Sequence, residues 1–255
     1  MIRNLWSMLV SWTSWVLVVV GTVVFSLSGF FLLWPLSVVF DRANGRLLHL
    51  VSRAWAGAIA VLLPFWEIRG QGMERIKKRV PYIVVCNHQS LMDIVVLLAK
   101  LPLHFKFIAK RELFWIPFFG WHLALAGYIL LKRKDAESGR QCLEKARGWL
   151  ERGVSVVFFP EGTRSPDGRI REFKMGAFKL ALEGQWDILP VVITGTRDAL
   201  PKHSCVVKKR SILSMTVLDP VSTKNRPLEE LESTRDHIRT ILLNEFNRLS
   251  CASSH

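Results

Sequence analysis

The segment 87–93, with the sequence Asn-His-Gln-Ser-Leu-Met-Asp, carries the side chains best suited to proton transfer. It follows an apolar run, 81–86, that is typical of a buried strand, and it precedes a run long enough for a helix. His88 would then lie at a strand-to-helix junction, where loose N–H groups and the helix dipole favour the neutral imidazole. Asp93 would fall in the first helical turn, where it could hold the other ring nitrogen. The pattern predicts a general base and the carboxylate that orients it.

A structural role accounts for the same residues equally simply. Ser90-x-x-Asp93 matches a capping box, which would make Asp93 a helix-start residue and nothing more. A lone histidine near an apolar strand is usually structural. The other motifs of the chain therefore decide between these interpretations.

A second motif places cations beside apolar surface. Lys110 and Arg111 follow a predicted strand, and a dense aromatic and aliphatic run leads from them to Gly120. This arrangement suits an amphiphilic ligand. The alternative is a buried loop with a solvated Lys-Arg pair.

A third motif is the segment 157–165, a strand that ends in a Pro-Glu-Gly turn followed by Thr163 and Arg164. Gly162 permits a close backbone approach, and the planar guanidinium of Arg164 suits a phosphate. A surface turn is the alternative. A fourth motif is the run 188–193, a strand whose internal Pro190 implies an edge or a distorted position, with a plain core strand as the alternative.

Together these four motifs resemble the 1-acylglycerol-3-phosphate (lysophosphatidate) acyltransferases and their glycerolipid acyltransferase relatives. The order is that of the family, and the resemblance covers roughly residues 66–218. The family's motifs are matched by Asn87, His88 and Asp93; by Lys110, Glu112, Leu113, Pro117 and Gly120; by Phe159 to Ser165, with Phe173, Lys174 and Gly176 after it; and by the run 188–193. One departure adds positive charge: Lys132-Arg133 stands where many relatives have Asp-Arg.

The resemblance implies acyl transfer from a thioester to the free hydroxyl of 1-acylglycerol-3-phosphate, forming phosphatidate. His88 would be the general base and Asp93 its orienting partner, while backbone N–H groups near Gly162 are expected to hold the oxyanion. The donor would be acyl-coenzyme A or acyl-acyl carrier protein, with no bound cofactor and no metal. The substrate-binding residues expected from the match are Lys110, Arg111, Glu161, Gly162, Thr163 and Arg164.

The N-terminal region of the chain is strongly apolar. No charged residue occurs from Leu5 to Phe40. As one straight helix this stretch would be about 54 Å long, beyond a hydrocarbon core of about 30 Å, so we expect it to tilt, break near 26–29 or Pro35, or turn back as a hairpin in one leaflet. Tryptophans at headgroup level would anchor it: Trp6, Trp12, Trp15 and Trp34. The segment 47–63 predicts a helix in the membrane interface or, equally, a core helix.

After Pro64 short strand-like runs alternate with helical ones, which predicts an α/β fold: a mixed, mostly parallel β-sheet flanked by helices, with an N-terminal apolar two-helix membrane-binding element. We expect residues 1–64 to form that element and 65–255 the acyltransferase domain. Helices are predicted at 137–152, at 173–183 and after Asn225. Strands are predicted at 65–69, 82–86, 105–109, 128–131, 154–159, 188–194 and 213–218.

The net charge and the cysteine content limit the partners and the cellular environment that we expect. The net charge of +14 suits an anionic membrane surface, phosphorylated substrates or nucleic acid. The cluster Lys208-Lys209-Arg210 lacks the aromatic interleaving of single-strand binders, so we expect no nucleic-acid partner. The four cysteines lie far apart and predict reduced thiols: Cys86, Cys142, Cys205 and Cys251. We expect attachment to the cytoplasmic face of the inner or plasma membrane.

Two rivals stay open. One is acylation of another acceptor, such as glycerol-3-phosphate or lyso-ornithine lipid, for which Lys132 is the reason. The other is a non-catalytic lipid-binding or scaffold protein, which would need neither His88 nor Asp93.

Overall fold

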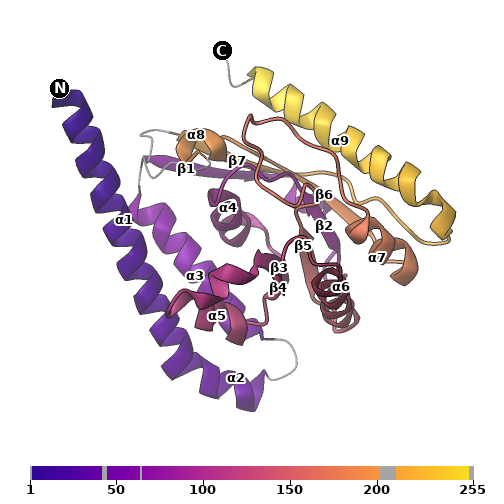
Figure 1. The fold of residues 1–255 in the computed structure, drawn as a ribbon, viewed down its shortest axis with the longest axis horizontal. Coiled ribbons are helices and arrows are strands. Elements are labelled where there is room, and N and C mark those ends of the chain that lie inside the picture. Colours follow the sequence, from indigo (N-terminus) through magenta and orange to yellow (C-terminus); the bar gives the residue numbers. More distant parts are fainter. Residues whose placement is uncertain (1, 42–44, 64, 202–210, 253–255) are drawn as a thin grey trace.

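A seven-stranded sheet forms the centre of the computed structural model, which describes residues 2–41, 45–63, 65–201 and 211–252 (Figure 1). The strand order is β1-β7-β6-β2-β5-β3-β4. All neighbouring pairs are parallel except β6 and β7, which are antiparallel. The strands are β1 (Trp66–Gln71), β2 (Ile83–Cys86), β3 (Phe105–Lys110), β4 (Ile129–Leu131), β5 (Ser155–Phe158), β6 (Ile188–Thr194) and β7 (Ser211–Val217). The predicted mixed, mostly parallel sheet is confirmed.

Helices cover both faces of this sheet. Side chains in and just before β2 alternate between two cores. One core contains Tyr82, Val84 and Cys86 with α3 (Arg46–Leu62) and α4, and the other contains Ile83 and Val85 with α6, α7 and α9. This alternation follows from the two-residue period of a strand. The helices after residue 64 are α4 (Met92–Lys100), α5 (Phe119–Leu125), α6 (Ala136–Glu151), α7 (Gly176–Gly184), α8 (Thr196–Ala199) and α9 (Leu231–Ala252), with 3₁₀ turns at Met73–Arg75, Arg111–Trp115 and Leu228–Glu230.

Every predicted strand and each of the three predicted helices is present, with ends shifted by a few residues. Pro190 lies in β6, between β2 and β7, so the core-strand interpretation is the right one. Its carbonyl accepts from Leu218, one residue past the end of β7. The nitrogen and the carbonyl of a strand residue point to the same side, so the nitrogen of Pro190 also faces Leu218, where β7 has ended. The N–H that proline lacks is therefore not missing from the ladder between β6 and β7.

The apolar N-terminus is one bent helical rod. Helix α1 (Ile2–Ser28) passes through a π-helical turn (Gly29–Leu33) into α2 (Trp34–Phe40), so the break falls at the predicted sites. The stretch Ser11–Phe40 is long and apolar enough to cross a membrane, and little of it is buried. Trp12 and Trp34 are exposed, whereas Trp15 packs against the core; the side chain of Trp6 lies outside those described.

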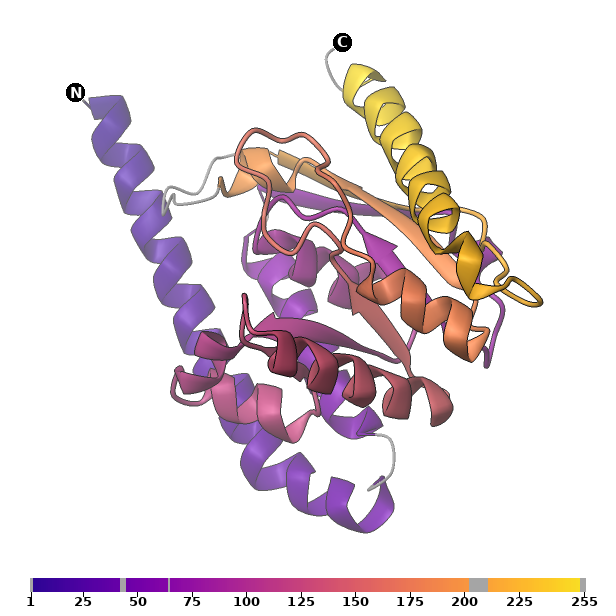
Figure 2. The same ribbon diagram turned by 45° about the vertical axis from the view of Figure 1, so that its right-hand side comes forward.

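The chain turns back only after Phe40, and α3 (Arg46–Leu62) runs beside α1 (Figures 1 and 2). Leu48, Ala56 and Ile59 on α3 are buried in the same core as the sheet. Burial of this face matches the core-helix interpretation of the segment. A domain boundary at residue 64 stays a prediction.

Three of the four cysteines lie within the described residues. Cys86, Cys142 and Cys251 are free thiols, as expected, and Cys205 lies outside the described residues. The cluster Lys208-Lys209-Arg210 lies outside them as well.

Candidate active site

The carboxyl ends of three adjacent parallel strands bring the site together. Strand β2 runs into His88, its neighbour β5 runs into Glu161, and β6 on the other side runs into Thr196. In open α/β sheets ligands bind at this edge. The Asn87 side chain locks the edge, because its amide donates to the Ile193 carbonyl and accepts from the Ile193 N–H, both at 2.8 Å.

His88 is held by its ring and by its backbone. Its Nδ1 lies 2.7 Å from Oδ2 of Asp93, and its ring stacks on Phe159 with centroids 4.1 Å apart. The Asp93 carboxylate can only accept, so Nδ1 must carry the hydrogen and Nε2 keeps its lone pair. The predicted pair of base and orienting acid therefore has the geometry that proton abstraction requires.

Asp93 also serves the helix start, so the two interpretations of the motif are compatible. Its Oδ2 accepts from the backbone N–H groups of Gln89, at 2.7 Å, and of Ser90, at 3.0 Å. Its Oδ1 accepts from the Thr196 hydroxyl at 2.5 Å. Three N–H groups and one O–H thus surround a side chain that is fully buried. These four donors hold the carboxylate in one orientation.

Glu161 fastens the loop after β5 to the histidine. Its Oε1 accepts from the His88 N–H at 2.9 Å, and its Oε2 accepts from the Arg171 N–H at 3.2 Å. Burial raises its pKa to about 7, and the charge of Asp93 adds to this, although the two backbone bonds favour the ionised form. Glu161 was predicted as a substrate-binding residue; the structure places it beneath His88, where it fixes the backbone.

Further bonds tie the same loop to the segment around His88. The Ser165 N–H donates to the His88 carbonyl at 2.8 Å, and the Gln89 amide donates to the Gly168 carbonyl at 2.8 Å. Gly162 has φ +70°, which favours glycine, and a Cβ there would lie 2.8 Å from Lys174 Cε. Its N–H donates to the Phe159 carbonyl at 3.0 Å. The turn itself thus uses this N–H, and the expectation that backbone N–H groups near Gly162 hold the oxyanion stays a prediction.

The predicted cations follow β5 and β3, whose carboxyl ends lie at the same edge of the sheet. Arg164 is half-buried, and burial followed by the nearby charge of Arg133 lowers its pKa, while Asp93 opposes both. Lys110 forms an exposed ion pair with Glu112 at 3.2 Å. Arg111 lines a separate cavity near β4. Thr163 is half-buried in the loop after β5.

An apolar cavity of 340 Å³ opens on the other side of the motif. Leu91 and Met92, which directly follow Ser90, line it, and so do residues of α1, α3, α4 and α5. Apart from the indole N–H groups of two tryptophans, its polar lining groups among the described residues are those of Thr22, Ser26, Ser52, His122 and Tyr128. The cavity thus lies between the apolar N-terminal helices and the segment that follows Ser90. Sequence reasoning did not identify it.

A half-buried histidine in contact with a buried carboxylate, together with a nearby apolar cavity, suits chemistry on a lipid. Residues 67–194 match the model of the Acyltransferase family. The chain belongs to this family. The computed structure of this acyltransferase also resembles the crystal structure of the 1-acyl-sn-glycerophosphate acyltransferase from Thermotoga maritima. The TM-score is 0.81 at 29% identity, over 97% of this chain and 98% of that one.

Curated relatives agree with this family. The acyltransferase is 39% identical to the chloroplastic 1-acyl-sn-glycerol-3-phosphate acyltransferase of Arabidopsis thaliana, over 67% of this chain and 47% of that protein. It is 34% identical to the mouse 1-acyl-sn-glycerol-3-phosphate acyltransferase alpha, over 72% of this chain and 65% of that protein. The chain spans about half the length of the plant relatives it matches.

Two contributions to the site escaped sequence reasoning. Thr196 lies more than one hundred residues from Asp93, and nothing in its local sequence distinguishes it. The pairing of Asn87 with Ile193 was equally hidden, although Asn87 itself belongs to the first motif. Both contacts depend on β6 lying beside β2, a neighbour relation that periodicity does not encode.

Proposed function

We propose that this acyltransferase transfers an acyl group from a thioester to the free hydroxyl of 1-acylglycerol-3-phosphate, forming phosphatidate. The contact of 2.7 Å between His88 Nδ1 and Asp93 Oδ2 supports the proposal most directly. It leaves Nε2 as the acceptor for the hydroxyl proton.

The reaction needs no nucleophilic side chain, because the thioester is already activated. His88 takes the proton as the hydroxyl oxygen bonds to the thioester carbon. Asp93 stabilises the resulting imidazolium. The tetrahedral intermediate then breaks its carbon–sulfur bond, and the thiol leaves with the proton that His88 returns. Neither a cofactor nor a metal enters this sequence.

Arg164 and Lys110 are the proposed holders of the acceptor's phosphate. The phosphate of 1-acylglycerol-3-phosphate lies only a few bonds from its free hydroxyl, so its cations must be near His88. Arg164 is close enough to Asp93 for their charges to interact. The pair of Lys110 with Glu112 is exposed, and such a pair contributes little, so a phosphate can compete for the lysine. Arg164 offers two parallel hydrogen bonds.

The apolar cavity is the proposed site of the donor's acyl chain. Leu91 and Met92, which line it, lie within four residues of His88 along the chain, which supports this assignment. Burial of each methylene there is favourable by about 0.8 kcal/mol. Because residues of α1 line the cavity, lipid chains can enter it from the membrane. This accounts for the apolar N-terminal helix that the α/β domain carries. We place this rod in the cytoplasmic face of the inner or plasma membrane, where acyl donors are found.

A panel of acceptors tests the proposal. Purified protein in detergent would receive a labelled acyl thioester with lysophosphatidate, glycerol-3-phosphate, lyso-ornithine lipid or a phosphate-free lysophospholipid. Preference for lysophosphatidate is expected. Turnover of another acceptor alone would overturn the acceptor assignment but keep the mechanism, and folded protein without any turnover would favour a lipid-binding role.

A further inference from the structure

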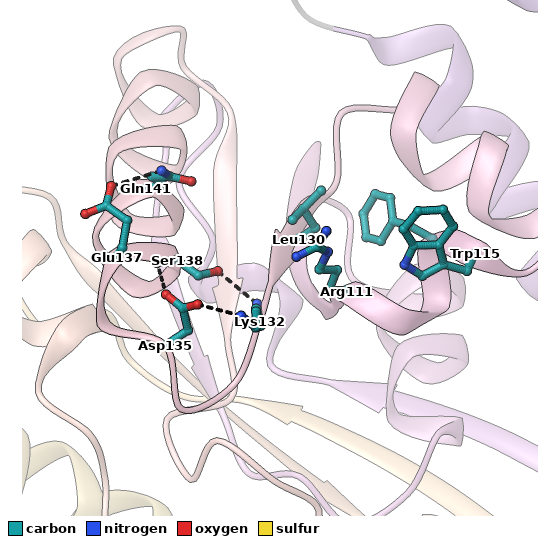
Figure 3. A pocket seen from close by; sticks show the side chains of 9 residues that line it. Arg111, Trp115, Leu130, Lys132, Asp135, Glu137, Ser138 and Gln141 are labelled. Carbon is teal, nitrogen blue, oxygen red and sulfur yellow. Dashed lines mark hydrogen bonds and ion pairs between the residues drawn. The ribbon is translucent and has the colours of Figure 1, made fainter.

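A second cavity, of 530 Å³, lies at the far end of the catalytic edge (Figure 3). Arg111 and Trp115 line it from the 3₁₀ turn after β3, and Lys132 lines it from the end of β4. Figure 3 shows the first residues of α6 on the opposite side, where Asp135, Glu137, Ser138 and Gln141 project. The cavity is separate from the apolar one and shares no lining residue with it.

The acids of this cavity are already engaged, whereas one of its cations is not. Asp135 pairs with Lys132 at 3.0 Å and caps α6 by accepting from the Ser138 N–H at 2.9 Å. Glu137 pairs with Arg140 and accepts from the Gln141 amide. Arg111 has no hydrogen bond or ion pair within the part of the chain that the structure describes. A positive group without a partner thus faces a space large enough for a ligand.

The other lining groups suit a chain that carries amides. Trp115 is 74% exposed and offers a large apolar face to a ligand. The Gln141 side chain uses its amide nitrogen on Glu137, which leaves its oxygen to accept from an N–H. Leu130 adds apolar surface between Arg111 and the strand edge.

The position of the cavity excludes the acceptor's phosphate. Strand β4 lies three places from β2 in the sheet, and β3, which leads into Arg111, lies two places from it, which corresponds to roughly 14 Å and 10 Å between the strand ends. The acceptor's phosphate is only a few bonds from the hydroxyl that reacts, so it cannot lie both here and beside His88. A ligand that fits must carry its phosphate far from the atom that reacts.

Positive charge connects the cavity with the catalytic edge. Arg133, the residue after Lys132, acts electrostatically on Glu112 and on Arg164, and Arg164 interacts with Asp93. Cations near the cavity thus interact electrostatically with residues close to His88.

We infer that this cavity binds the 4′-phosphopantetheine arm of the acyl donor, with Arg111 on its phosphate. The inference rests on the proposed function. The phosphate lies at one end of this extended arm and the thioester at the other, so the arm spans the distance from β4 to His88. Trp115 covers its dimethyl-bearing carbon, and Gln141 accepts from an amide. Coenzyme A and acyl carrier protein share this arm.

Kinetics with a matched pair of donors test the assignment. Acyl-4′-phosphopantetheine and acyl-pantetheine differ only in the phosphate. Arg111→Gln should raise the KM of the phosphorylated donor about tenfold, as expected for a lost charge-assisted hydrogen bond. It should leave the KM of acyl-pantetheine and that of lysophosphatidate within about twofold. Lys145→Gln, which removes an exposed cation of α6 that does not line the cavity, is the matched control and should change none of these values. Acyl-coenzyme A and acyl-acyl carrier protein identify the source, and Arg111→Gln must weaken whichever the protein uses.

A calorimetric titration makes the test independent of turnover. Free 4′-phosphopantetheine should bind the wild type more tightly than Arg111→Gln, even if the protein acylates none of the acceptors. Equal affinities would overturn the inference while leaving the proposed function intact. A raised KM for lysophosphatidate alone, or a loss confined to binding of anionic vesicles, would overturn it as well and assign Arg111 to the acceptor or to the membrane surface.

Discussion

Asp93 Oδ1 accepts a hydrogen bond of 2.5 Å from the Thr196 hydroxyl, across 103 residues of sequence. Because the other carboxylate oxygen serves the His88 ring, Thr196 fixes the rotation of the carboxylate that orients the base. Thr196 is fully buried and follows β6 directly. We regard it as a positioning residue rather than a catalytic one.

Thr196→Val removes this hydroxyl with little change of shape. We expect kcat to fall about tenfold with little change in either KM, because a freer carboxylate aligns His88 less often. Thr196→Ser keeps the hydroxyl and should retain most of the activity. Equal losses in both variants, or a loss that follows the melting temperature, would indicate a packing role only.

Asp93→Asn separates orientation from helix capping. The amide oxygen can still accept from Gln89 and Ser90, so the melting temperature should fall only slightly. With that oxygen in the Oδ2 position the NH₂ group faces Thr196, and the neutral amide no longer stabilises an imidazolium at His88, so kcat should fall by about 100- to 10,000-fold. Asp198→Asn, an exposed acid on α8, is the control. A drop in stability without a matching loss of turnover would leave Asp93 as a helix-start residue.

The raised pKa of Glu161 predicts that the stability of the protein depends on pH. Its folded pKa of about 7 lies above the ordinary value of 4.5, so the folded state holds this proton more tightly than the unfolded state. Its contribution to stability is therefore highest below about pH 4.5 and falls as pH rises to about 7. Glu161→Gln should remove this trend.

Thermal unfolding from pH 4.5 to 8 measures the trend directly. The melting temperature of the wild type should fall relative to that of Glu161→Gln across this window. Glu172→Gln, an exposed acid in the same loop, should run parallel to the wild type. If the melting temperature of Glu161→Gln followed that of the wild type over this pH range, burial would not control the pKa of this carboxyl group.

The apolar cavity predicts a limit on acyl-chain length. Ser26 on α1 lines it, three residues before Gly29, which packs against His122. Ser26→Phe fills part of the cavity and should shift the preference towards shorter acyl donors, as read from kcat/KM over a series of chain lengths. Val24→Phe enlarges an exposed residue on the same helix and should leave the preference unchanged. An unchanged preference in Ser26→Phe would place the acyl chain elsewhere.

Local features of the sequence predicted the elements and the first half of the site. His88 and Asp93 are five residues apart, so a strand followed by a helix suffices to bring them together. Strand order has no such local signal: β7 separates β1 from β6, and β5 separates β2 from β3. Consequently Thr196 and the site of Arg111 became visible only in three dimensions. Glu161 was found by its motif, but its bond to the His88 backbone depends on β5 lying beside β2.

The most direct test of the general-base assignment is the rate of acyl transfer to lysophosphatidate by His88→Ala in detergent. His237→Ala, an exposed histidine on α9, is the control, and circular dichroism confirms that both variants are folded. The account predicts a loss of about 100- to 10,000-fold in kcat for His88→Ala and wild-type turnover for His237→Ala. Turnover by folded His88→Ala within about threefold of the wild type would contradict it, since general-base catalysis contributes far more than that.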